Sequence, residues 1–410
     1  MNRPALRTKG RPSTSELPAE LEISLSNSCS LACTYCHFGI DGPERRLRLT
    51  AERACRGLGR YIKATREAGV EIERIGFPDS PDPLSSYGVL KECVSHIRRM
   101  LGNGVTIEVQ TNGLLLDAEK VRFLSGRGVR LVLRLDAGRV SNDRHRVFFG
   151  KGERSVFNEV LGRVKALPAG YAESIQVAPS FTTVTAAGIG RSVEALYRVG
   201  FREIQFKSLN LSDIWPESGL KALRSGLREL KSFCRPLVSP KFSGAGRLRL
   251  HLTSFKSNGG GFCELVLGCD GRFYPASFTP KAPAGLDLYI GDVKSGIDAG
   301  RLSVIKAEIS AYLERHGHDG LLRYVPSYPA LYQSIILRGL DVSEAIRSNG
   351  LKSILILKEL GGLMRLDERL NSSAQICSRR GRNAAGGGRG AEQGEGWAVA
   401  RRRQESPGTL

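Results

Sequence analysis

The chain has 410 residues, of which 41% are hydrophobic, and its 61 lysines and arginines against 41 acidic residues give a formal net charge of +20. This length accommodates two or three domains, or one large catalytic domain with a satellite. No apolar run approaches the ~18 residues that a membrane span needs. No apolar segment follows the basic N-terminus, so an integral membrane protein and a secretory signal are both excluded.

We therefore expect a cytoplasmic protein without a membrane partner, in which the nine cysteines do not form a disulfide framework. The basic net charge favours nucleic acid or an anionic peptide as a partner. Residues 1–18 are expected to be a disordered basic N-terminus, and the Gly/Arg-rich residues 376–410 a disordered tail, because neither contains enough apolar residues to form a core.

Short β-rich runs alternate with amphipathic helical patterns over residues 19–235. The pattern predicts strands at 21–25, 72–76, 105–110, 129–134, 175–181 and 203–206, and helices at 50–68, 89–101, 117–124, 155–167, 190–199 and 219–233. Six strand–helix units in regular order predict an α/β fold with a parallel sheet, because parallel neighbours need long return connections. Six units are fewer than the eight of a closed barrel, so we expect a partial (β/α)6 barrel whose chemistry lies at the C-terminal ends of its strands.

The pattern changes after the predicted barrel. Short β-rich runs at 247–252, 264–267, 272–274 and 288–290, separated by glycine-containing turns, predict a small β-hairpin module over residues 236–300. Helical periodicity returns over residues 301–375.

A cysteine cluster follows the first predicted strand. Cys29, Cys33 and Cys36 are spaced by four and three residues on one predicted loop, so their thiolates can converge on a single site. Three thiolates leave one position of a [4Fe–4S] cluster free for a substrate or cofactor. Tyr35, directly before the last cysteine, is placed to shield such a cluster from water.

Two other kinds of site use the same residues. Cys33, Cys36 and His37 match the C-x-x-C-H pattern of covalent haem attachment, but this chemistry is usual in exported proteins and leaves Cys29 unexplained. A structural zinc ion held by the three cysteines and His37 is the other alternative, although adjacent Cys36 and His37 reach one tetrahedral ion with difficulty.

The CSLACTYC motif of residues 29–36 resembles the CxxxCxxC signature of the radical S-adenosylmethionine (SAM) superfamily, in particular its branch with SPASM or twitch C-terminal domains. This resemblance implies one [4Fe–4S] cluster whose open iron binds SAM through its amino and carboxylate groups. It also implies reductive cleavage of SAM to methionine and a 5′-deoxyadenosyl radical, which abstracts hydrogen from a substrate.

Further motifs agree with this branch in order and spacing: TNGLLL at 111–116, RLD at 134–136, NDRHR at 142–146 and SVFNEV at 155–160. The resemblance implies that Gln110 and Asn112 lie near SAM at the end of the third strand. It likewise implies that Arg134 and Asp136 end the fourth strand, and that Arg146 is a candidate partner of the SAM carboxylate, because a guanidinium binds a carboxylate by two hydrogen bonds.

The sequence departs from this branch at two places. Where the family has a GGEP-like turn that holds the SAM amino group, residues 76–84 read GFPDSPDPL. Either Asp79 or Asp82 can pair with the ammonium group, and either can instead cap the helix that follows. The second departure is Arg134, where the family has a small hydroxyl residue; a positive side chain there alters the SAM pocket or faces the substrate.

The 236–300 module resembles a degenerate twitch domain. FCELV at 262–266, DGRFYP at 270–275 and IGDV at 290–293 match the family's hairpin, but Ala276 replaces an expected cysteine. Cys263 and Cys269 alone cannot hold a four-cysteine auxiliary cluster, so we expect one cluster only. Cys55, Cys93 and Cys234 fall in helical patterns and are interpreted as core residues.

The resemblance implies a radical SAM enzyme that modifies a peptide or protein side chain and receives electrons from a donor such as flavodoxin or ferredoxin. Two alternatives remain: modification of RNA or a nucleotide-like substrate, which the net charge favours, and an iron–sulfur or zinc module without catalytic activity. The sequence does not identify a catalytic residue beyond the cofactor ligands.

Overall fold

The computed structural model describes residues 17–34, 36, 47–79, 81–136, 138–150, 154–206, 214–238, 247–252, 264–275, 288–315, 342–360 and 365–366. Its strands are β1 (Glu20–Ile23), β2 (Arg74–Phe77), β3 (Thr106–Thr111), β4 (Arg130–Leu133), β5 (Gln176–Val177), β6 (Glu203–Phe206), β7 (Arg249–Leu252), β8 (Leu265–Leu267), β9 (Phe273–Pro275), β10 (Gly291–Asp292), β11 (Gly296–Ile297) and β12 (Arg365–Leu366). Its α-helices are α1 (Ala51–Glu67), α2 (Tyr87–Leu101), α3 (Ala118–Gly126), α4 (Arg139–His145), α5 (Val156–Lys165), α6 (Ile189–Val199), α7 (Glu217–Leu237), α8 (Gly300–Arg315) and α10 (Val342–Leu360). Short 3₁₀ turns are η1 (Pro83–Ser86), η2 (Ala172–Ser174) and η3 (Ala186–Gly188).

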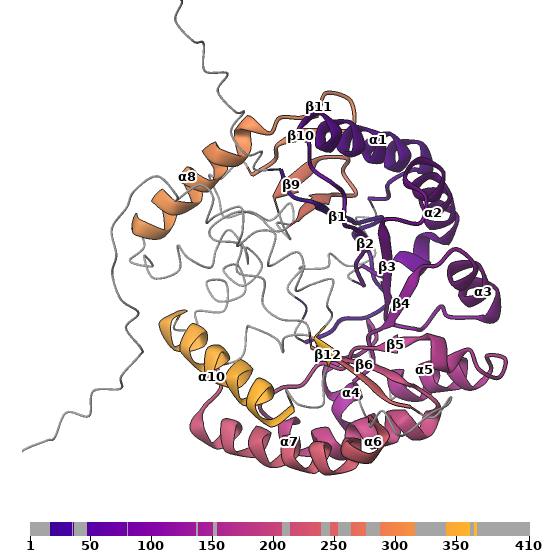
Figure 1. Ribbon diagram of the computed structural model, residues 1–410, viewed down its shortest axis with the longest axis vertical. Helices are drawn as coiled ribbons and strands as arrows, with labels where there is room; N and C mark the ends of the chain where they lie inside the picture. Colours follow the sequence, from indigo (N-terminus) through magenta and orange to yellow (C-terminus); the bar gives the residue numbers. More distant parts are fainter. Residues whose placement is uncertain are drawn as a thin grey trace, which may run out of the picture.

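One curved sheet organises the molecule. Its strand order is β12-β7-β6-β5-β4-β3-β2-β1-β8-β9, and every neighbouring pair is parallel except β8 and β9. The sheet bends into an arc with α1, α2, α3, α5, α6 and α7 on its outer side (Figure 1). Within the described residues the sheet does not close on itself, and the expected α/β fold with a mostly parallel sheet is confirmed.

The helices begin where the sequence supplies capping side chains. Thr50, Asp117 and Ser155 each accept a hydrogen bond from a backbone N–H in the first turn of α1, α3 and α5, which satisfies donors that the helix itself leaves open. The outward side chains of the strands, such as Leu21 and Ile75, are fully buried beneath the helices. The alternating strand pattern thus places the apolar core between sheet and helices.

All six predicted barrel strands are present as β1–β6, but the C-terminal expectations need correction. Arg249–Leu252, expected in a separate hairpin module, is β7 and pairs in parallel with β6. The β8–β9 hairpin forms as predicted but extends the barrel sheet through β1, and the run at 288–290 is not a strand. The sequence of a short strand does not specify which sheet the strand joins, and only its hydrogen-bonded neighbours in the structure do so.

The predicted helical region after residue 300 contains α8 and α10, and α10 packs against α7 (Figure 1). Residues 316–341, 361–364 and 367–375 of this region lie outside the described residues, as do residues 1–16 and the predicted tail. Within the described part of the chain, no helix has the length and apolar character to cross a membrane. The short helix α4, between β4 and α5, was missed by the sequence patterns.

The inner face of the sheet carries a cluster of charged side chains around Arg74. Its guanidinium donates to Glu20 at 2.7 Å, to Glu264 at 2.9 Å and to Glu22 at 3.3 Å, and lies 3.8 Å from Glu108. Gly76 makes room for this side chain, since a Cβ there would collide with Arg74 Nη1. Four strands or strand ends are therefore joined through one guanidinium.

We predict that Arg74→Met lowers the free energy of unfolding by about 3–5 kcal/mol, because it leaves several largely buried carboxylates without their shared partner. Arg56→Met is the control: Arg56 pairs with Glu52 on the exposed side of α1, and its loss is expected to cost less than about 1 kcal/mol. Urea-induced unfolding measures both. Equal effects of the two substitutions would show that the cluster does not hold the sheet together.

Candidate functional site

The cysteine loop starts at the C-terminal end of β1 and is held by a short antiparallel ribbon. Ala32 N donates to Val147 O at 2.7 Å and Thr34 N donates to His145 O at 2.8 Å, on either side of Cys33. A β-bridge between Leu31 and Phe148 continues the ribbon. The loop that carries the thiols is thus fixed to the segment that follows α4.

The three thiols lie in one partly buried environment. Burial raises the pKa of Cys33 to about 12, although the nearby Arg146 lowers it, while the charges of Cys29 and Cys36 raise it further. Burial also raises the pKa of Cys29, whose Sγ accepts a hydrogen bond from Asn112 Nδ2 at 3.7 Å. Ligation by a metal reverses such shifts, because the thiolate is the form that binds.

Cys29, Cys33 and Cys36 are thiols on one loop, and thiolates are the usual ligands of iron–sulfur clusters. Among the described residues, no three His, Cys, Asp or Glu side chains stand close enough together to hold one ion. His37, the fourth ligand of the zinc alternative, lies outside the described residues, as does Tyr35, the expected shield.

Asp82 is a buried structural hub after β2. Its Oδ2 accepts hydrogen bonds from Thr111 Oγ1 and Asn112 N, each at 2.7 Å, and its Oδ1 accepts from Leu84 N at 2.9 Å. Burial raises the pKa of Asp82 to about 6 against the lowering effect of these bonds. One carboxylate oxygen, Oδ1, therefore caps η1, and the other, Oδ2, fixes the end of β3.

Asp79 is the other acidic residue of this turn. It faces Arg134, which lies at the end of β4. Arg134 Nε lies 3.7 Å from Asp79 Oδ2, and Arg134 Nη2 donates to Ser180 Oγ at 3.3 Å. Nε and Nη1 of Arg134 are buried without a hydrogen-bond acceptor among the described residues. The pair thus places a carboxylate beside a guanidinium that retains donor capacity, at the C-terminal ends of β2 and β4.

Asp136 and Arg146 form a second, more deeply buried pair. Arg146 Nε lies 3.4 Å from Asp136 Oδ2, and both side chains are at most 3% exposed. Asp136 Oδ1 accepts from Ser180 N at 2.7 Å, and Asp136 N donates to Asn142 Oδ1 at 3.2 Å. The structure therefore brings Arg146 to the cysteine loop and to Asp136 together.

Of the remaining expected residues, Gln110 is buried on the inner face of β3, where it donates to Glu108 Oε1 at 2.7 Å. Sequence reasoning did not single out His145, whose Nδ1 lies 2.9 Å from Thr34 Oγ1 and whose Nε2 lies 3.4 Å from Thr182 Oγ1. His145 lies within the NDRHR motif, and Thr182 follows the fifth strand. The NDRHR motif and the position of Thr182 after a strand were the available signals.

The other cysteines that the structure describes lie away from this site. Cys93 and Cys234 are fully buried, as expected for core residues, whereas Cys55 is half-buried and its hydrogen bond to Cys93 lowers its pKa to about 7. Cys269 is buried beside the β8–β9 turn. Cys263 lies outside the described residues.

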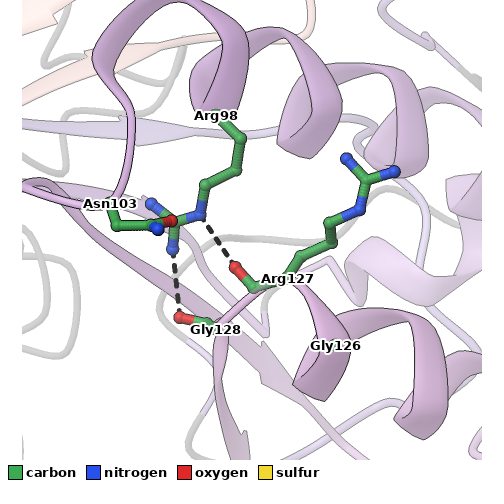
Figure 2. Close-up of a pocket in the computed structure, with 5 residues that line it drawn as sticks. All are labelled: Arg98, Asn103, Gly126, Arg127 and Gly128. Carbon is green, nitrogen blue, oxygen red and sulfur yellow. Dashed lines mark hydrogen bonds between the residues drawn. The ribbon is translucent and has the colours of Figure 1, made fainter.

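A pocket of about 380 Å³ lies at the opposite edge of the sheet, where β3 and β4 begin. Figure 2 shows the Arg98 guanidinium within it, donating to the carbonyls of Arg127 and Gly128. Arg98 also donates to the carbonyls of Gly102 and Val105. Because these bonds join the end of α2 to two loops, the arginine serves the fold and this pocket is not the candidate site.

Comparisons with known proteins agree with this geometry. Residues 23–167 match the family model described as "Radical SAM superfamily". A curated relative, "PqqA peptide cyclase" from Streptomyces rochei, is 31% identical over 118 residues, which cover 27% of this chain and 28% of that protein. The chain thus matches about a quarter of that relative.

Two solved structures share the fold. "Native anSMEcpe with bound AdoMet" has a TM-score of 0.55 at 17% identity, covering 87% of this chain and 99% of that chain. "Native anSMEcpe with bound AdoMet and Cp18Cys peptide" has a TM-score of 0.54 at 18% identity, covering 88% of this chain and 99% of that chain. At this level of identity the likeness establishes the fold alone.

We predict that Asp82→Ala lowers the free energy of unfolding by at least about 2 kcal/mol, because three buried donors lose their acceptor. Asp117→Ala is the matched control, since Asp117 caps α3 at a more exposed position, where the typical cost is about 1 kcal/mol. Chemical denaturation compares the two variants. A loss for Asp82→Ala no larger than the control would contradict the role of Asp82 as a hub.

Proposed function

Residues 23–167 form a radical SAM domain, and from this premise we propose that the chain is an enzyme that reductively cleaves SAM at one [4Fe–4S] cluster. Cys29, Cys33 and Cys36 would hold the cluster. The observation that carries this proposal is the cysteine loop, which stands at the C-terminal end of β1 and is fixed to the α4 segment by two backbone hydrogen bonds. When bound, the cluster and SAM supply a 5′-deoxyadenosyl radical that abstracts hydrogen from the substrate.

The residues around the loop divide into supporting and binding groups. Asp82 uses both oxygens within the fold, so we assign the SAM ammonium to Asp79. Arg134 has buried donors without acceptors among the described residues and is suited to a carboxylate. Arg146 remains a candidate for the same carboxylate, and Asp136 orients it. Asn112 donates to Cys29 and would tune the cluster through its thiolate. Gln110 lies on β3, two residues before Asn112, and lines the SAM pocket in this proposal.

A peptide or protein side chain is the proposed substrate. Two likenesses support it: the curated relative is named for a peptide, and one of the solved structures with this fold contains a bound peptide. Inside the barrel, Gln176 Oε1 is buried and accepts no hydrogen bond within the described residues, and an amide oxygen of this kind suits a peptide N–H. A reducing cytoplasm is the proposed setting, because the described cysteines are free thiols.

The first test is reductive SAM cleavage by the anaerobically reconstituted protein. With dithionite as the reductant, we expect 5′-deoxyadenosine and one cluster's iron per chain. Cys33→Ala should lose both, while Cys234→Ala, which alters a buried thiol on α7, should retain both. Chromatography and iron analysis give the answer. A wild-type protein that binds iron but forms no 5′-deoxyadenosine would be a binding module rather than an enzyme.

The assignment of Asp79 predicts that Asp79→Asn weakens SAM binding about 10-fold or more, since a charged hydrogen bond is lost. Glu159→Gln is the control, because Glu159 pairs with Arg154 away from the site and its loss should leave SAM binding unchanged. Equilibrium dialysis of the reconstituted proteins with labelled SAM measures both. Unchanged affinity in Asp79→Asn would return the ammonium to another partner.

A further inference from the structure

Two thiols meet between the helices α1 and α2, on the outer side of the sheet. Cys55 lies on α1 and Cys93 on α2, and these helices pack against each other (Figure 1). A hydrogen bond joins the two side chains, so their sulfur atoms are neighbours, although both are free thiols. Neither residue belongs to the cysteine loop or to the turn that carries Asp79. The pair is therefore a chemical site separate from the candidate SAM site.

The two thiols differ in exposure and in acidity. Cys55 is half-buried, whereas Cys93 is fully buried. The hydrogen bond from Cys93 lowers the pKa of Cys55 to about 7 against the raising effects of burial and of Glu92, and Arg99 also lowers it. The same hydrogen bond, together with burial, raises the pKa of Cys93. At neutral pH, about half of Cys55 is therefore thiolate, while Cys93 keeps its proton.

This arrangement supplies both parts of a reversible dithiol. The thiolate is the nucleophilic form of cysteine, and it attacks best when its pKa lies near the ambient pH. A second thiol in contact with the first can then convert the oxidised product into a disulfide. In the reducing cytoplasm proposed for this chain, disulfides that form are usually transient and either catalytic or redox-sensing.

We propose that Cys55 and Cys93 are a peroxide-reactive dithiol that closes into a disulfide. The Cys55 thiolate attacks one oxygen of hydrogen peroxide, the O–O bond breaks, and hydroxide leaves while Cys55 becomes a sulfenic acid. Cys93 then attacks the Cys55 sulfur, so that an S–S bond forms, the S–O bond breaks, and the leaving hydroxide takes the Cys93 proton as water. In sum the two thiols lose two electrons and one hydrogen peroxide becomes two waters. A cellular thiol reverses the step by thiol–disulfide exchange.

The disulfide would link the helices on either side of β2 in the chain. The segment between Cys55 and Cys93 contains β2 together with Asp79 and Asp82, so the closed loop restrains the turn that borders the candidate site. The inference does not depend on the proposed function, because the pair contains none of the proposed cluster ligands.

The alternative interpretation is that the two thiols only fill space between α1 and α2. Cysteines buried in apolar surroundings are inert, and Cys234 is an example, because burial raises its pKa to about 12. Cys55 differs from Cys234 in both exposure and pKa. A metal ion is not a better explanation, since no three His, Cys, Asp or Glu side chains of the described residues could hold one.

The test maps the thiols of the anaerobically reconstituted full chain. The protein is treated with an equimolar amount of hydrogen peroxide, free thiols are blocked with N-ethylmaleimide, and the chain is cut with trypsin without a reductant. Cleavage after lysine and arginine releases residues 54–56 and 92–98 as two peptides, and each contains one cysteine of the pair. Mass spectrometry identifies their disulfide directly. Cys93→Ser removes the second thiol, and Cys234 is the control within the same chain.

We expect the two peptides to be linked in the wild type and to separate when dithiothreitol is added before digestion. Cys55 should be consumed at least about 10-fold faster than Cys234, because it is more exposed and more acidic. In Cys93→Ser, dimedone should trap a sulfenic acid on Cys55 in place of the disulfide.

Three results would each overturn the dithiol proposal: unlinked peptides in the oxidised wild type, a Cys234 thiol that reacts as fast as Cys55, or a disulfide from Cys55 to a cysteine other than Cys93. The wild-type map decides the question even where Cys93→Ser fails to fold. No readout involves 5′-deoxyadenosine, so failure of the proposed function is recognised separately.

Discussion

The buried carboxylate of Asp82 is the constraint on which the site depends. It accepts three hydrogen bonds, from Leu84 N in η1 and from Thr111 and Asn112 at the end of β3. Asn112 in turn donates to Cys29. A single side chain after β2 therefore fixes the end of β3 relative to the first cysteine. A carboxylate buried in this position is stable because both of its oxygens accept hydrogen bonds.

Two layers of charge surround this hub. Deeper in the barrel, Arg74 gathers the carboxylates of Glu20, Glu22 and Glu264, so the inner face of the sheet is held together by ion pairs. At the strand ends, the pairs Asp79–Arg134 and Asp136–Arg146 each span more than one element. Several arginines of this chain thus form ion pairs inside the fold. The net charge of +20 therefore does not by itself indicate nucleic acid as the partner.

Much of the fold could be predicted from the sequence because alternating and helical patterns report which face of an element is buried. The six barrel strands and their helices follow this rule. The β-rich run of β7 was predicted, but its pairing with β6 and that of β12 with β7 were not, because pairing joins segments that no local pattern links. The short helix α4, whose exposed face carries Val140, was missed because seven residues show too little periodicity.

The site shows a similar division. The spacing of Cys29, Cys33 and Cys36 was sufficient to predict a shared ligand site, because spacing on one loop is a local property. The roles of Asp79 and Asp82 were open, since either residue satisfies the sequence pattern and only the hydrogen bonds of Asp82 distinguish them. The approach of His145 to Thr34 joins residues 111 positions apart, which no local pattern reports.

Electron paramagnetic resonance of the reduced, reconstituted protein, recorded with and without SAM labelled at its carboxylate, is the most direct measurement of whether the loop leaves one iron accessible. A change in the cluster signal on addition of SAM, with coupling to the labelled carboxylate, is the expected result. A signal indifferent to SAM, or an undiminished cluster signal after replacement of all three loop cysteines by alanine, would contradict the assignment of the loop as the SAM-binding cluster site.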